Sequence, residues 1–130
     1  MGIRENVAML VRDVEAGRFV EATDTHYADD VSTYELTGTV TVGKTAVLAK
    51  ERYYQSTVES WHHIEAVNVL VDGQMAAIHW KYDITTAGKR VTREEIALQQ
   101  WSGDGANARI VREQYFTATP SVIPAENPRR

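Results

Sequence analysis

Four segments in the second half of the chain alternate polar and apolar positions and are rich in β-branched and aromatic residues, which is typical of strands. These segments are HHIEAVNVLV (62–71), MAAIHWKYDIT (75–85), KRVTREEIALQQW (89–101) and RIVREQYFTAT (109–119). The breaks between them are short and contain glycine, which favours tight hairpin turns. The second half of the chain is therefore predicted to form an antiparallel meander of four strands.

The first half of the chain shows helical periodicity instead. Apolar residues recur at i, i+3, i+4 and i+7 from Val7 to Val14, and Gly17 is a suitable residue to end that helix. The other elements predicted here are a short helix at 18–27, a strand at 31–36 and a third helix at 44–57. Helices that precede an antiparallel sheet, rather than alternating with its strands, indicate the α+β class.

The composition fits one folded domain. Of the 130 residues, 43% are hydrophobic and 25% are charged, as in ordinary globular proteins with one core and no membrane span. We predict a single domain over residues 1–118, followed by a proline-rich tail at 119–130. The first residues mix charged and apolar positions at helical spacing and do not resemble a signal peptide, so a cytoplasmic location is expected.

Several classes of function are disfavoured by charge and residue content. The net charge of −4 offers no basic surface, so nucleic acid is not an expected partner. The absence of cysteine excludes disulfides, thiolate nucleophiles and cysteine-ligated zinc. The four histidines lack a recognised ligand spacing, and no phosphate-binding glycine loop or nucleophile elbow is present. We therefore expect no metal and no cofactor.

The turn positions predict which strand residues share a face of the sheet. A turn at residues 72–73 sets residue 63 against 82, a turn at 87–88 sets 82 against 93, and the last hairpin sets 97 against 113. One face is then predicted to carry His63, Glu65, Val67, Val69, Ile78, Trp80, Tyr82, Arg93, Glu95, Ala97, Gln99, Val111, Glu113 and Tyr115. Its polar residues gather at one end, which predicts a pocket with a polar mouth and an apolar floor.

The opposite face is predicted to mix apolar and charged side chains. Its apolar members are Ile64, Ala66, Leu70, Ile96 and Leu98. An exposed apolar patch of this kind favours burial against a second subunit. A homodimer is therefore expected.

Three passages carry a resemblance to a known superfamily. They are YADDVSTYELTGTVTVGKTAV (27–47), VLVDGQMAAIHWKYDITTAGKRVT (69–92), and EEIALQQW with RIVREQYF. Together with the order of the predicted elements, they resemble the nuclear transport factor 2-like superfamily, which includes ketosteroid isomerases, SnoaL-like polyketide cyclases and limonene epoxide hydrolases. The last pair looks most like SnoaL-like proteins. The resemblance implies a cone-shaped, cystatin-like fold in which N-terminal helices pack on a strongly curved antiparallel sheet.

The resemblance also implies roles for individual residues. Glu35 matches the position of the general base of ketosteroid isomerases. The aspartate and tyrosine that stabilise the oxyanion in those enzymes fall at Ala97 and at Leu10 or Val11, none of which has a hydrogen-bond donor in its side chain. The Arg93-Glu94-Glu95 sequence is similar to the Arg-x-Asp pair of the epoxide hydrolases, with glutamate in place of aspartate.

Residue chemistry and resemblance together define the candidate site. The predicted catalytic residues are Glu35, His63, Arg93, Glu95 and Glu113. The predicted substrate-binding residues are Tyr34, Trp80, Tyr82, Ala97, Gln99 and Tyr115. Each group also has a purely structural explanation: a surface ion pair for Glu35, a salt-bridge network for the Arg93 group, and ordinary core packing for the aromatics.

The function predicted from the sequence is that of a pocket protein for a small, mainly apolar molecule with a polar edge. Cofactor-free acid/base chemistry fits the carboxylates best, and isomerisation, aldol-type cyclisation and hydration or hydrolysis all remain open. The alternative is a module of the same fold that binds a small ligand or dimerises without catalysis.

Overall fold

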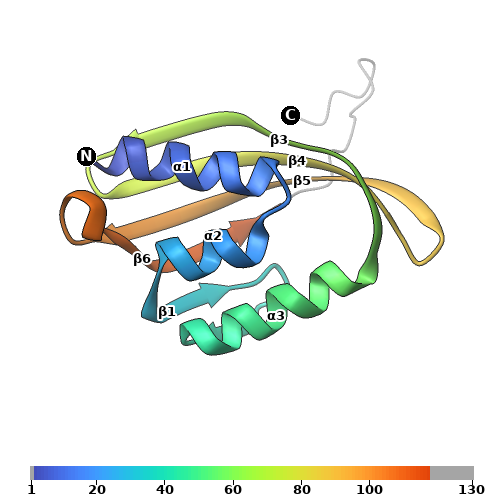
Figure 1. Ribbon diagram of the computed structural model, residues 1–130, viewed down its shortest axis with the longest axis horizontal. Helices are drawn as coiled ribbons and strands as arrows, with labels where there is room; N and C mark the ends of the chain where they lie inside the picture. Colours follow the sequence, from blue (N-terminus) through green and yellow to red (C-terminus); the bar gives the residue numbers. More distant parts are fainter. Residues whose placement is uncertain (1, 118–130) are drawn as a thin grey trace, which may run out of the picture.

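The computed structural model describes residues 2–117 and shows three helices, a short 3-10 helix and six strands (Figure 1). The helices are α1 (Ile3–Glu15), α2 (Phe19–His26), α3 (Lys44–Thr57) and η1 (Gly105–Asn107). The strands are β1 (Tyr27–Tyr34), β2 (Val40–Val42), β3 (Val58–Asp72), β4 (Met75–Thr86), β5 (Lys89–Ser102) and β6 (Arg109–Phe116). The predicted proline-rich tail at 119–130 lies outside the described residues.

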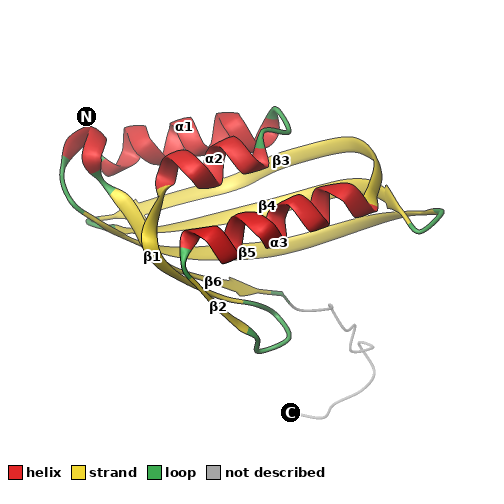
Figure 2. Ribbon diagram, turned by 60° about the horizontal axis from the view of Figure 1, so that its bottom comes forward, coloured by secondary structure: helices red, strands yellow, loops and turns green. Residues whose placement is uncertain are grey.

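The six strands form one sheet in the order β2-β1-β6-β5-β4-β3. All neighbours are antiparallel except β1 and β6, which pair in parallel. The helices lie on one face of the long, curved strands (Figure 2). The predicted α+β fold, with helices packed on a curved and mostly antiparallel sheet, is therefore confirmed.

The core forms where the helices meet the sheet. The apolar stripe of α1 buries Val7 and Leu10, which have 0% and 2% of their surface exposed. From the sheet, Trp101 and Ile110 are buried to a similar degree. The start of α1 is capped because the Glu5 carboxylate accepts a hydrogen bond of 3.0 Å from the Gly2 amide. These contacts fix the helices over the concave face.

The first half of the chain holds more strand than its sequence pattern predicts. β1 begins at Tyr27, four residues before the start of the strand predicted at 31–36, so Asp29 and Asp30 belong to the strand. The edge strand β2 lies between the predicted strand at 31–36 and the predicted helix at 44–57, where no strand was predicted. The parallel pairing of β1 with β6 joins distant parts of the chain, and local periodicity does not encode such pairing.

Two of the three predicted hairpin registers keep the expected faces. β4 and β5 pair as predicted, with Tyr82 opposite Arg93 and Ile78 opposite Ala97. β5 and β6 are shifted by two residues, so that Gln99 rather than Ala97 lies opposite Glu113. A shift of two preserves the face of a side chain, whereas a shift of one reverses it.

The predicted register of β3 against β4 is wrong. The strands pair from Asp72 and Met75, and the register shifts at three irregular points along β3. As a result, Ile64 and not His63 lies opposite Tyr82. Ile64 and Ala66, which were expected on the outer face, instead contribute to the core. His63 and Glu65 therefore lie on the outer face, because each bulge adds a residue that the alternation rule does not count.

Candidate functional site

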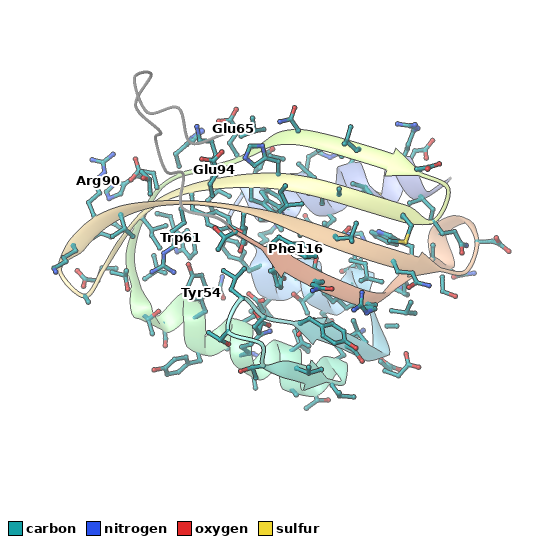
Figure 3. All side chains as sticks on the ribbon, turned by 180° about the vertical axis from the view of Figure 1, so that it is seen from behind. Tyr54, Trp61, Glu65, Arg90, Glu94 and Phe116 are labelled. Atoms are coloured by element: carbon teal, nitrogen blue, oxygen red, sulfur yellow. The ribbon has the colours of Figure 1, made fainter. Side chains whose placement is uncertain are left out.

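An open cavity lies between the three helices and the concave face of the sheet. Its inner wall includes the core-facing Leu10 of α1, Phe19 of α2, Tyr54 of α3 and Trp80 of β4. Tyr54 packs edge-on against Trp61, with ring centroids 6.0 Å apart (Figure 3). The aromatic wall is therefore continuous from the helices to the edge strand β3.

Glu113 is the most enclosed carboxylate of this cavity, with 2% of its surface exposed. The hydroxyls of Tyr27 and Tyr115 donate hydrogen bonds to its Oε1, the latter at 2.6 Å. Gln99 donates from Nε2 to Oε2 at 2.7 Å, and Trp101 donates to the Gln99 Oε1 at 3.2 Å. Three donors hold the carboxylate in place, which satisfies a negative charge that would otherwise be costly to bury.

The tyrosines around Glu113 remain protonated. Burial raises the pKa of Tyr27 well above its usual value, and the negative charge of Glu113 adds to the effect. Burial and Glu113 raise the pKa of Tyr115 in the same way. Both hydroxyls are therefore fixed hydrogen-bond donors at neutral pH.

A second carboxyl group, Glu95, lies on the neighbouring strand β5. It accepts a hydrogen bond from the Tyr82 hydroxyl. Burial raises the pKa of Glu95, with a further contribution from Glu113, while the Tyr82 hydrogen bond and Arg93 oppose the rise. Arg93 also borders the cavity, where its charge opposes the burial-driven rise in the pKa of Tyr54.

The third carboxyl group, Glu51 of α3, was not singled out from the sequence. Burial raises its pKa from 4.5 to about 7, Lys50 opposes this rise, and Glu113 and Glu95 add to it. Among the described residues, Glu51 has no hydrogen-bond or ion-pair partner of its own. A cavity carboxyl with a pKa near neutrality exchanges protons readily at physiological pH, which general acid or base catalysis requires.

Glu35 lies in a different environment from Glu51. The Lys50 ammonium donates to Glu35 Oε1 and, at 3.1 Å, to the Thr33 hydroxyl, which in turn donates to Glu35 at 3.3 Å. Burial lowers the pKa of Lys50, while the charges of Glu51 and Glu113 oppose that change. Glu35 thus borders the cavity as one half of an ion pair.

The cavity brings most of the sequence-predicted site residues together. Those that line it from the inner side are Glu35, Trp80, Tyr82, Arg93, Glu95, Gln99, Glu113 and Tyr115. Arg93 makes no ion pair of 4.0 Å or less with Glu95 or Glu113 in the described part of the chain, so the alternative of a salt-bridge network is not observed.

Three predicted site residues lie elsewhere. His63 borders the cavity only where it opens over the sheet edge, and 65% of its side chain is exposed beside Glu65. Tyr34 does not line the cavity, because the alternation of β1 buries its neighbour Thr33, and Arg112 stacks over its ring at 4.2 Å. Ala97 is fully buried in the core below the cavity. The expected placement of His63 next to Tyr82 and Arg93 is therefore wrong.

Glu51 could have been found from helical spacing. It lies four residues after Val47, which is buried, and three residues before Tyr54. Positions i, i+4 and i+7 share one helix face, so a carboxyl group in this apolar stripe must face the sheet.

Neither metal ligation nor membrane insertion is indicated by the described residues. Across residues 2–117, no three histidine, aspartate or glutamate side chains are grouped so that they could hold a metal ion. In the same part of the chain, no helix has the length and apolar character needed to cross a membrane.

Three helices packed on a curved, mostly antiparallel sheet form the fold of the nuclear transport factor 2-like proteins. Within that class, the model of the SnoaL-like domain matches residues 4–117. The chain therefore belongs to the SnoaL-like family. No match is found among curated proteins.

Solved structures agree with this assignment. A protein from Mesorhizobium loti, proposed to be a SnoaL-like polyketide cyclase, is 27% identical, with a TM-score of 0.75 over 90% of this chain and 100% of the other. A protein of ketosteroid isomerase-like fold from Catenulispora acidiphila, solved with trimethylamine, is 16% identical, with a TM-score of 0.71 over 88% and 85%. An NTF2-like protein of unknown function from Burkholderia xenovorans is 17% identical, with a TM-score of 0.72 over 95% and 88%.

Proposed function

We propose that the protein is a cofactor-independent acid/base enzyme that acts on a small molecule in the inner cavity, with Glu51 as the group that transfers the proton. The observation that carries this proposal is the position of Glu51, which lines the cavity without a hydrogen-bond or ion-pair partner in the described chain, and burial there raises its pKa to about 7. At neutral pH, Glu51 is present in both protonation states, so it can remove a proton from one carbon or oxygen and return it to another.

The other polar groups of the cavity support this role. Lys50 already holds Glu35 in an ion pair, so Glu35 is less available as a base than the sequence suggested. The Tyr27 and Tyr115 hydroxyls donate their protons to Glu113, so their oxygens remain as acceptors that can orient a donor group of the substrate. Arg93 borders the same cavity and can stabilise negative charge that develops on a substrate oxygen.

Proton removal from a carbon next to a carbonyl is shared by isomerisation and aldol-type cyclisation. This shared step can be measured before the natural substrate is known. Incubation of the protein with a panel of cyclic ketones and 1,3-diketones in D2O should replace their acidic C–H protons with deuterium, which proton NMR follows directly.

Glu51→Gln keeps the size of the side chain and removes the base, so exchange should fall at least about 100-fold. The matched control is Glu21→Gln, which alters an exposed glutamate of α2 and should leave exchange unchanged. Full exchange in Glu51→Gln together with its loss in Glu35→Gln would return the role of base to Glu35.

A second candidate function is ligand binding without catalysis. It is favoured by Glu113, whose oxygens are both occupied by donors from the protein itself. The fold relative solved with trimethylamine shows that a protein of this shape can hold a small amine. A binder should show no deuterium exchange with any ketone of the panel. Glu51→Gln should then change only the affinity of the protein for its ligand.

The proposal includes a cytoplasmic homodimer, as expected from the sequence. It is supported by exposed apolar side chains on the outer face of the sheet, which include Leu70, Ile96 and Phe116. Leu70 does not line the cavity, whereas Ile96 and Phe116 border it, so a dimer formed through this face would adjoin the cavity of each subunit.

A further inference from the structure

The cavity holds more negative than positive groups. Three carboxyls, Glu51, Glu95 and Glu113, border it, and of the lysine and arginine side chains that line it, Lys50 is already paired with Glu35, which leaves Lys81 and Arg93. The hydrogen-bond partners of Glu95 and Glu113 are neutral hydroxyls and an amide. In the described part of the chain, no ion pair neutralises any of the three carboxyls.

The pKa directions agree with this imbalance. Burial raises the pKa of Glu51 and Glu95, the charge of Glu113 raises both further, and Glu95 adds to the rise for Glu51. Arg93 is the one guanidinium among the cavity residues of the described chain, and its charge only partly offsets the rise for Glu95. An added positive charge would relieve this repulsion, whereas an anion would increase it.

The cavity wall is aromatic on both sides. Trp61 packs against Phe19 with ring centroids 4.7 Å apart, and edge-on against Tyr54 at 6.0 Å. On the sheet, Trp80 and Tyr82 lie nearly parallel, with centroids 6.4 Å apart. The faces of such rings attract cations, and they bind alkylated ammonium groups well because these groups are weakly hydrated.

From these two features in one cavity, we infer that the ligand is a small organic cation, such as a tertiary or quaternary amine. The inference rests on the proposed function for the site and names the class of substrate that the site takes. Carboxylates alone would suit a metal ion, but no suitable group of ligands is present in residues 2–117. Aromatic rings alone would suit the mainly apolar molecule expected from the sequence, but such a molecule would leave Glu51, which has no hydrogen-bond or ion-pair partner in the described chain, without a positive charge beside it.

The direct test compares choline with 3,3-dimethylbutan-1-ol, which has the same shape but a carbon in place of the charged nitrogen. Calorimetry and the indole NH signals of Trp61 and Trp80 would follow binding to the cavity. Choline should bind at least about tenfold more tightly than the neutral compound at pH 8. Its affinity should fall as the pH falls through 7, because Glu51 then takes up a proton and loses its charge.

Two variants of equal size locate the effect. Glu51→Gln and Glu95→Gln should each reduce choline affinity about tenfold at pH 8, and Glu51→Gln should also abolish most of its pH dependence. Glu21→Gln is the matched control, because Glu21 is an exposed glutamate of α2 that does not line the cavity. Thermal unfolding of each variant would verify that it is folded.

Equal binding of choline and the neutral compound would overturn the inference, as would the absence of choline binding at millimolar concentrations. Neither result would affect the proton-exchange experiment, which uses neutral ketones. Loss of exchange overturns the acid/base function, whereas loss of the preference for a cation overturns only the ligand class.

Discussion

At the scale of single residues, burial determines what a side chain does in this protein. Glu51 and Glu21 are both helical glutamates, but only Glu51 faces the cavity, where its pKa rises to about 7. Residue type alone predicted that carboxylates would carry the chemistry. Which carboxylate has this role depends on which side chain is removed from water, and Glu51 is removed from water because it lies on the face of α3 that is turned toward the sheet.

His26 provides a test of the cost of burial at a second residue. It is 2% exposed, and neither of its ring nitrogens has a hydrogen-bond partner in the described structure. Burial lowers its pKa, the charge of Asp13 opposes that change, and Arg109 adds to it. The nearest carboxylate oxygen, on Asp13, is 3.8 Å away, and the ring lies edge-on to Trp101.

The sign of the pH effect follows from this lowered pKa. Below pH 6.5, the usual histidine pKa, His26 is protonated in the unfolded chain but remains largely neutral in the folded protein. The free energy of unfolding therefore falls as the pH falls. His26→Phe removes both the unpaired nitrogens and this proton uptake. Urea unfolding should show a gain of about 1–3 kcal/mol at pH 5 and a smaller gain at pH 8. A His26→Phe variant that is no more stable than the parent at pH 5, or that gains less stability at pH 5 than at pH 8, would contradict this account.

At the scale of elements, the registers show which parts of a sheet a sequence determines. The β4–β5 hairpin was predicted correctly because a two-residue turn fixes it and no bulge interrupts it. The β3–β4 register was predicted wrongly, because its pairing shifts at three irregular points that the local sequence does not reveal. This difference accounts for the correct placement of Glu95 and Arg93 and the wrong placement of His63.

A substitution in the β4–β5 turn should increase the stability of the protein. Ala87 and Gly88 have φ values of +52° and +73°, and the left-handed region is unfavourable for alanine. Asn-Gly is preferred where both central residues have positive φ. Ala87→Asn should therefore raise the free energy of unfolding by roughly 0.5–1 kcal/mol in urea denaturation.

Ala87→Val is the matched comparison, because a β-branched side chain is the least suited to positive φ. It should destabilise the protein, and both variants should keep the activity of the parent because the turn is exposed and does not line the cavity. A lower stability for Ala87→Asn than for Ala87→Val would show that the turn does not adopt this conformation in solution.

At the scale of the whole molecule, the two faces of the sheet differ in their surroundings. The concave face carries the cavity, and the outer face exposes Leu70, Ile96 and Phe116 by 68%, 44% and 45%. The sequence predicted the outer patch only in part, because Ile64 proved to belong to the core. The prediction that helices close over the sheet came from the family resemblance, because local sequence patterns do not specify the parallel pairing of β1 with β6.

The outer patch should hold a homodimer together. Ile96→Lys places a charge in its centre and should convert the protein to monomers of 14.6 kDa in size-exclusion chromatography with light scattering. Tyr53→Lys alters an equally apolar but separate position on the exposed side of α3 and should leave the dimer intact. A parent protein that is already monomeric at micromolar concentration would contradict the prediction.

The central claim is that Glu51 titrates near neutrality inside the cavity. Carbon-13 NMR of protein labelled at the glutamate carboxyl carbons would follow each carboxyl from pH 4 to pH 9, and Glu51→Gln would assign the relevant signal by its loss. We predict a midpoint of about 7 for Glu51, well above the ordinary glutamate value of 4.5. A midpoint near 4.5 would contradict the account, because Glu51 would then be a permanently ionised carboxylate without a reason to act as the proton-transfer group.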